Sequence, residues 1–210
     1  EDILRTQLRA AIRASVYGTL WIMFPMVSGL EDFEKARIIV MEEKARLEQS
    51  GIKVKNSIKL GVMIETPAAV MMADQLAKQV DFASIGSNDL CQYLTAADRM
   101  NSSVAKYCRS SHPALYRAIA MTVRAFQKEN KPLSICGELG GDKYAACVLV
   151  GLGMRKLSMS ANAIPVVKQM LSRFELSDLE AVATAVLDCS DADEVEQCME
   201  KFLHCKRNQY

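Results

Sequence analysis

The sequence predicts an α/β protein of the (β/α)8 TIM-barrel type, a partial barrel that lacks about three N-terminal strands. Short apolar runs alternate with segments of helical period, which indicates parallel strands joined by right-handed crossovers. Polar residues follow several of these runs, and a barrel enzyme carries its site at the carboxyl ends of several strands. No G-x-G-x-x-G follows a strand, so a dinucleotide-binding open sheet has no support.

The elements follow from periodicity and turn residues. Helical spacing predicts helices at residues 3–15, 30–49, 67–78, 114–129, 144–150 and 165–173. Apolar runs between turn residues predict strands at residues 21–26, 60–65, 82–87, 133–137 and 157–160, apolar on both faces as a helix-covered parallel sheet requires. Residues 177–210 predict one or two amphipathic C-terminal helices of the same domain, with Ser177 opening an S-D-L-E capping box.

The spacing of the strands is the reason for predicting a partial barrel. The five strand starts span 136 residues over four repeats, or 34 residues each. Eight such repeats would need about 272 residues, close to the ~250 that the fold typically uses. With 210 residues and no initiating Met, we expect a processed chain or an excerpt from a longer one, forming a single domain over residues 1–210 that is incomplete at its N-terminus.

Composition excludes several classes of protein. Half of the residues are apolar and 24% are charged, as in an ordinary globular protein. Lys and Arg number 26 against 25 Asp and Glu, and this net charge of +1 argues against nucleic acid as the main partner. No apolar run is long enough to span a bilayer and no secretory signal precedes the first helix, so we expect no membrane association.

The seven cysteines indicate free thiols in a reducing compartment, which we expect to be the cytoplasm. They form no C-x-x-C pair, and their number is odd. With only His112 and His204 available, a zinc site of thiolates and imidazoles is not expected. His112 stands before Pro113 at the start of a helix, which favours an N-cap over a phosphorylatable histidine.

Two carboxylates follow neighbouring strands. Glu65 ends G-V-M-I-E, and Asp89 lies in S-I-G-S-N-D-L beside Asn88. By themselves, Glu65 could complement a helix dipole and Asn88–Asp89 could form a turn. Because the two strands are adjacent, the carboxylates can converge, and hard oxygen ligands without His or Cys suit Mg²⁺ or Mn²⁺.

An arginine and a thiol complete the candidate site. Arg99 lies ten residues after Asp89; it is either a surface charge paired with Asp98 or a bidentate clamp for phosphate or carboxylate. Cys136 ends a strand before the glycine-rich turn C-G-E-L-G-G-D. It is either a packed strand-end thiol or a nucleophile or proton donor at the mouth of the barrel.

Five motifs in register give a family resemblance. G-V-M-I-E-T-P-A-A, S-I-G-S-N-D-L, A-A-D-R, C-G-E-L-G-G-D and L-S-M-S-A resemble the C-terminal phosphoenolpyruvate (PEP)-binding barrel of enzyme I, over about residues 2–173. Enzyme I is the PEP–protein phosphotransferase of bacterial sugar uptake. I-M-F-P-M is similar to an earlier strand of that barrel.

The resemblance implies a function and a set of roles. A PEP-dependent phosphotransferase moves the phosphoryl group to a protein histidine and releases pyruvate. Glu65 and Asp89 would bind Mg²⁺ (or Mn²⁺), Asn88, Asp89 and Arg99 would hold PEP, and Cys136 would protonate C3 of the enolate. The partners would be PEP and pyruvate, the histidine-bearing domain, the phosphocarrier HPr and a second copy in a homodimer.

The chain also departs from the family. It has no acceptor domain, and it lacks the first barrel strands with their phosphate-binding arginines, so we expect no complete phosphotransfer from it alone. Trp21, Cys91 and Met100 stand where the family commonly has a basic residue, Thr and Gly. The alternatives are the barrel of a pyruvate phosphate dikinase or PEP synthase, and a non-catalytic remnant that dimerises.

Overall fold

The computed structural model describes residues 1–205, and the side chains of residues 1–202. Its centre is a four-stranded parallel sheet in the order β1 (Trp21–Phe24), β2 (Lys59–Ile64), β3 (Phe82–Gly86) and β4 (Leu133–Cys136). The predicted α/β class with a parallel sheet is therefore confirmed. The four strands begin within one residue of their predicted starts, because each starts where an apolar run follows a turn.

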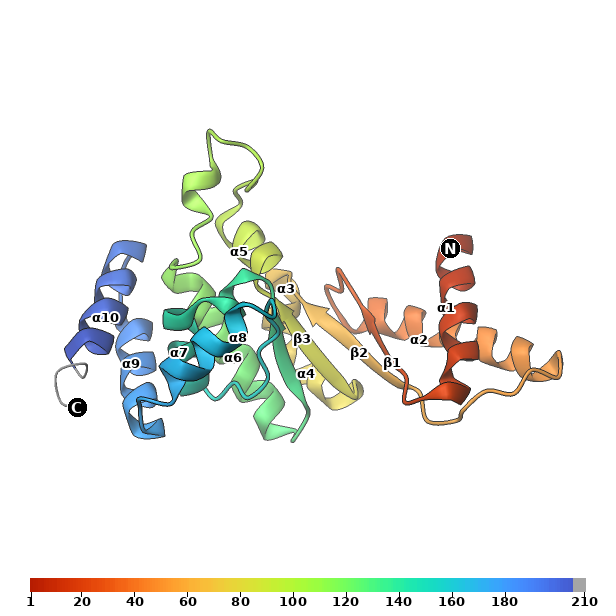
Figure 1. Ribbon diagram of the computed structural model, residues 1–210. Helices are drawn as coiled ribbons and strands as arrows, with labels where there is room; N and C mark the ends of the chain where they lie inside the picture. The colour runs from red at the N-terminus through yellow and green to blue at the C-terminus, as the bar shows by residue number, and fades with distance from the viewer. Residues whose placement is uncertain (206–210) are drawn as a thin grey trace.

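Helices connect the strands, several of them lie against one face of the sheet, and the last two pack on other helices at the far end of the molecule (Figure 1). They are α1 (Asp2–Ala14), α2 (Leu30–Gln49), α3 (Pro67–Met71), α4 (Ala73–Gln79), α5 (Ser87–Thr95), α6 (Pro113–Lys128), α7 (Lys143–Gly151), α8 (Ala163–Leu171), α9 (Leu176–Asp188) and α10 (Ala192–Cys205). Short 3-10 turns occur at Ser15–Tyr17, Ala105–Tyr107 and Glu138–Gly141. None of the helices within residues 1–205 is both long and apolar enough to cross a membrane.

The two faces of the sheet are covered unequally, which corrects the prediction that the strands are buried on both faces. Val62, Ile64 and Ile85 point toward the helices and are inaccessible to solvent. On the other face Trp21 remains 40% exposed, and its ring lies 4.7 Å from that of Phe82. Apolar pattern alone does not distinguish these faces, since side chains on both are apolar.

Three further predictions need correction, and one falls partly outside the described residues. The segment predicted as a fifth strand, residues 157–160, lies beside β4 but forms only one bridge, Ile135 with Leu157. The single helix predicted at residues 67–78 is divided into α3 and α4 at Met72. The capping box begins at Glu175, not Ser177, because Glu175 has an extended backbone and its N–H donates to Asp178 Oδ2 at 3.1 Å. Residues 206–210 of the predicted C-terminal helices lie outside the described part.

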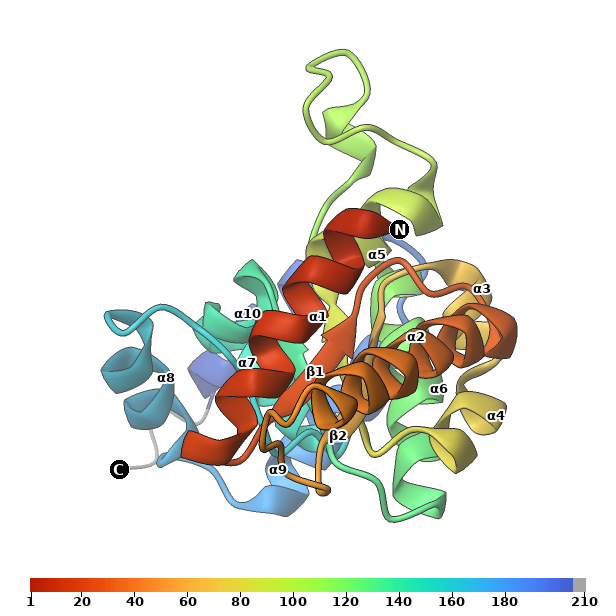
Figure 2. The ribbon, with the colours of Figure 1, turned by 90° about the vertical axis from the view of Figure 1, so that its right-hand side faces the viewer.

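The helix α5 was not predicted, and it changes how the site is built. Ser87, Asn88 and Asp89 are turn formers by composition, yet they form the first turn of this helix directly after β3. Leu90 and Cys91, both buried, hold the helix against the core. After α5 the chain projects away from the sheet before it returns to α6, as both views show (Figures 1 and 2).

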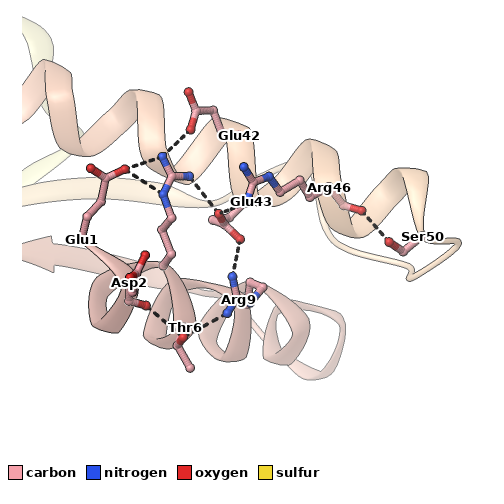
Figure 3. A network of polar contacts seen from close by, with 9 residues as sticks. Glu1, Asp2, Thr6, Arg9, Glu42, Glu43, Arg46 and Ser50 are labelled. Atoms are coloured by element: carbon pink, nitrogen blue, oxygen red, sulfur yellow. Dashed lines mark hydrogen bonds and ion pairs between the residues drawn. The ribbon is translucent and has the colours of Figure 1, made fainter.

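An ion network ties α1 to α2 beside β1 (Figure 3). The Glu43 carboxylate is inaccessible to solvent and accepts hydrogen bonds from Arg5 at 2.9 Å, Arg9 at 3.1 Å and Arg46 at 3.2 Å. These guanidinium groups, Arg5 first, lower the pKa of Glu43 below its ordinary value. A carboxylate with a lowered folded-state pKa stabilises the fold above its unfolded pKa, and this contribution disappears as the pH falls through the folded pKa.

Glu43→Gln is therefore expected to lower the melting temperature at pH 7, because three arginines lose their shared charged partner. The difference from the parent should shrink as the pH falls through the Glu43 pKa, where the parent carboxylate is itself neutral. Thermal denaturation followed by circular dichroism between pH 3 and pH 7 measures this. Glu42→Gln, which removes a half-exposed partner of Arg5, is the control and should have a smaller effect. A Glu43→Gln protein that melts like the parent at pH 7 would refute the network's role.

Candidate functional site

Every predicted site residue except Arg99 lies where a strand ends at the carboxyl edge of the sheet. Glu65 directly follows β2, Asn88 and Asp89 open α5 after β3, and Cys136 is the last residue of β4. Thr66 accepts a hydrogen bond from the Ala69 N–H at 3.1 Å and so caps α3 just after Glu65. Parallel strands bring these positions to one edge, as the sequence predicts.

Glu65 is held in place from two sides. Only 3% exposed, it accepts a hydrogen bond from the Met26 backbone N–H to Oε1 at 2.7 Å. Met26 has φ 55°, an uncommon conformation for a residue other than glycine, so the chain after β1 accepts strain where its N–H points at this carboxylate. A Cβ on Gly86 would lie 2.8 Å from Glu65 Oε2, so glycine is needed there to leave room for the carboxylate.

Burial raises the pKa of Glu65, and the neighbouring Asp89 carboxyl raises it further, whereas the Met26 N–H opposes the shift. Desolvation and a nearby like charge both disfavour the ionised form. The two carboxyl groups predicted to converge are thus close enough to influence each other. This is the electrostatic situation that a cation between them would relieve.

Arg99 approaches the pair from the projecting segment after α5. Its Nη1 lies 3.1 Å from Asp89 Oδ1, with the two side chains 41% and 38% exposed. Asp98, the alternative partner, instead accepts a hydrogen bond from the Met100 N–H at 2.8 Å. The structure therefore brings Arg99 to Asp89, so a guanidinium charge lies beside the two carboxylates.

Cys136 occupies the neighbouring strand end and is half-buried. Its Sγ donates to the Ile85 carbonyl at 3.4 Å, and its own carbonyl accepts a hydrogen bond from Ser87 Oγ at 2.8 Å. The next residue, Gly137, has φ 96°, which lies in the region that favours glycine. The thiol therefore lies at the end of β4, within hydrogen-bonding distance of β3.

A hollow of about 570 Å³ opens next to these residues, within the range of small-molecule sites. Its lining residues come from α5, the segment before α6, the turn that follows Gly137, and the segment that leads into the first residue of α8: Asn88, Ser110, Gly137, Glu138, Leu139, Gly141, Asp142, Met159, Ser160 and Ala163. Asn88 is the one predicted site residue among them, and its Oδ1 accepts from the Glu138 N–H at 3.4 Å.

The oxygen ligands that Glu65 and Asp89 offer can be compared with what a divalent cation requires. In the part of the chain that the structure describes, no group of three or more His, Cys, Asp or Glu side chains could hold a metal ion. Glu65 and Asp89 together supply hard oxygen ligands, and Mg²⁺ usually takes only one or two carboxylates, completing its shell with water and substrate oxygens. The pair fits such an ion as the protein's share of its ligands.

Sequence reasoning missed two groups at the site. The Met26 backbone N–H carries no residue-type signal, because any residue but proline can donate there. Ser87 is part of S-I-G-S-N-D-L, but its turn propensity favoured an exposed loop, so a buried hydroxyl was not expected there. His112, by contrast, is a helix cap as expected, and its Nδ1 accepts from the Ala114 N–H at 3.2 Å.

Two carboxylates and a thiol lie at the carboxyl edge of a parallel sheet, and Arg99 reaches Asp89 there; this is the edge at which α/β barrel enzymes carry their sites. The family model for the PEP-binding domain of PEP-utilising enzymes matches residues 1–176. The chain belongs to this family.

Similar proteins of known name support this family membership. The chain is 46% identical over 202 residues to a phosphoenolpyruvate-protein phosphotransferase of Listeria monocytogenes, covering 96% of the chain and 35% of that protein. Proteins of the same name from Priestia megaterium and Bacillus subtilis are each 43% identical, over 97% and 93% of the chain and 36% and 34% of their own length. The chain thus spans about a third of these relatives.

Among solved structures, a citrate lyase from Burkholderia xenovorans superposes with a TM-score of 0.57 at 16% identity, covering 98% of this chain and 68% of that one. At this identity the likeness concerns the fold alone.

Proposed function

We propose that this chain is the PEP-binding part of a phosphoenolpyruvate–protein phosphotransferase of bacterial sugar uptake. The observation that carries the proposal is the convergence of Glu65, Asp89 and Arg99 at one edge of the sheet, with Cys136 on the neighbouring strand end. The name shared by the relatives supports the reaction and makes a pyruvate phosphate dikinase or PEP synthase less suitable as the alternative. A remnant kept for dimerisation alone would have no need of this arrangement.

In this proposal each residue has a separate task. Glu65 and Asp89 hold Mg²⁺ or Mn²⁺, which supplies positive charge beside the substrate's oxygens when bound. Arg99 and Asn88 bind the phosphate and carboxylate of PEP, and Arg99 moves from Asp89 toward the ligand as it does so. These groups fix PEP with its phosphoryl group accessible to the acceptor histidine.

The proposed transfer of the phosphoryl group leaves an enolate, which Cys136 protonates. The P–O bond of PEP breaks as a P–N bond to the histidine of another domain forms, and the electron pair stays with the enol oxygen. Cys136 then donates its proton to C3, giving pyruvate and a thiolate that regains a proton from water. HPr would receive the phosphoryl group from that histidine.

We further propose that residues 1–210 are one incomplete (β/α)8 domain, with α9 and α10 as its C-terminal helices, acting as a cytoplasmic homodimer. The open edge at β1, with Trp21 exposed beside it, supports a sheet that continues in a complete barrel. Since the relatives are about three times as long, the chain alone should bind PEP more weakly than they do and should not complete the transfer.

Calorimetric titration of the chain with PEP or oxalate tests the proposed function. Binding should be measurable with Mn²⁺ or Mg²⁺ present and should disappear when a chelator removes the ion, because the carboxylate pair repels an anion that arrives without a cation. Succinate, a dianion like oxalate that chelates the ion far more weakly, is the control and should bind far more weakly. Equal binding of PEP with and without the metal would refute the assignment.

A further inference from the structure

A buried hydroxyl joins the two halves of the proposed site. Ser87 is 1% exposed, and its Oγ donates to the Cys136 carbonyl at 2.8 Å, across the sheet from α5 to the end of β4. Asn88 makes a second link by accepting from the Glu138 N–H at 3.4 Å. The first turn of α5, which carries Asp89, is thereby attached to the residues on both sides of Gly137.

The turn after Cys136 is shaped to receive this hydroxyl. A Cβ on Gly137 would lie 2.5 Å from Ser87 Oγ and 3.1 Å from Asn88 Oδ1, so a side chain there would displace both. Gly86 and Cys136 are also paired in the register of β3 and β4. Ser87 thus fills the space between the strand end and the helix start, and it is the side chain that holds the Cys136 carbonyl.

The thiol itself is held only weakly. Its one hydrogen bond in the described structure runs to the Ile85 carbonyl at 3.4 Å, and a thiol is a weak donor. The orientation of Sγ therefore depends on the backbone of Cys136, whose carbonyl Ser87 holds. Misplacing a reacting group by about 1 Å can cost roughly a hundredfold in rate, so this constraint matters for a proton donor.

We propose that Ser87 is a positioning residue, which fixes the Cys136 thiol relative to the Glu65–Asp89 pair through the Cys136 carbonyl. It touches no reacting atom in this arrangement. The inference rests on the proposed function, because it gives Ser87 a purpose only if Cys136 acts on a ligand held by the carboxylates. The effect of Ser87 on the placement of the Cys136 thiol can be measured without any ligand.

The test measures how fast iodoacetamide alkylates Cys136, as a function of pH, with the modified peptide quantified by mass spectrometry. Ser87→Ala should raise the Cys136 rate by about five- to tenfold at pH 7.5, the change expected when one hydrogen bond is lost and the turn opens. Ser87→Thr keeps the hydroxyl and should restore the parent's rate and pH profile. If Ser87→Ala does not fold, Ser87→Gly, which also lacks the hydroxyl, takes its place with the same expected rise.

Thr122→Ala is the matched control. Thr122 is also buried, and its Oγ1 donates to the Ala118 carbonyl at 2.9 Å within α6, away from Cys136. This variant should leave Cys136 alkylation unchanged. A parent-like rate in Ser87→Ala, or an equal rise in Thr122→Ala, would overturn the proposal. If instead the parent itself fails to bind oxalate with Mn²⁺, the proposed function fails while the alkylation result still stands.

Discussion

Replacing Glu65 with glutamine is expected to abolish the Mn²⁺-dependent binding of oxalate. The substitution keeps the size and the hydrogen bond from the Met26 N–H but removes one of the two charges that the cation needs. Losing a partner outside the first ligand shell typically costs about 10- to 100-fold in metal affinity, so the loss of a direct ligand should exceed that range. Isothermal calorimetry with Mn²⁺ and oxalate measures the effect.

Two companion variants make this result specific. Gly86→Ala leaves every charge in place but directs a methyl group at Glu65 Oε2, so it should weaken binding by about 10- to 100-fold. Glu180→Gln removes an exposed carboxylate on α9 and should bind like the parent. If Glu65→Gln binds oxalate and Mn²⁺ as the parent does, Glu65 is not a metal ligand.

The same carboxylate gives the binding a pH dependence. Burial and Asp89 raise the pKa of Glu65, and a metal ligand must be deprotonated. Affinity for Mn²⁺ with oxalate should therefore fall as the pH drops through this raised pKa, at higher pH than for an exposed carboxylate. An affinity that stays constant down to the pH at which an exposed carboxylate titrates would argue against the involvement of Glu65.

Cys136→Ser is expected to abolish pyruvate formation once the chain is joined to the N-terminal part of such a phosphotransferase. Binding of the metal and of PEP should persist, because Cys136 holds neither in the proposed arrangement. A serine hydroxyl is too weak an acid to protonate the enolate, and acid catalysis by one positioned group is typically worth ~10²–10⁴-fold. Steady-state pyruvate release and PEP binding measure the two effects separately.

Other thiols serve as controls for this result. Cys91 and Cys147 are buried, and desolvation raises the pKa of each to about 12, which makes them poor acids at neutral pH. Their replacement by alanine should change stability and not turnover. Bound oxalate and Mg²⁺ should also protect Cys136 from alkylation. Full turnover in Cys136→Ser would leave this thiol as a packing residue.

The position of each site residue relative to the apolar runs explains which parts of the site the sequence alone could predict. Each of four site residues ends or directly follows an apolar run: Glu65, Asn88, Asp89 and Cys136. Because parallel strands all end at one edge of the sheet, the proximity of these residues follows from periodicity. The five motifs then identified the family. The sequence analysis missed the helix α5, because Ser, Asn and Asp at its start favour both turns and the first turn of a helix.

The sequence by itself determined the class of fold, the starts of the four strands and the residue types at the carboxyl edge, because these depend on local pattern. Only the tertiary structure decided that Arg99 pairs with Asp89 and not Asp98, that the Met26 N–H holds Glu65, and that Ser87 reaches Cys136. Each of these contacts joins residues that lie on different elements, and the contact of Arg99 is made from a segment that projects from the sheet. Their geometry depends on how helices and strands pack, and no local pattern encodes that.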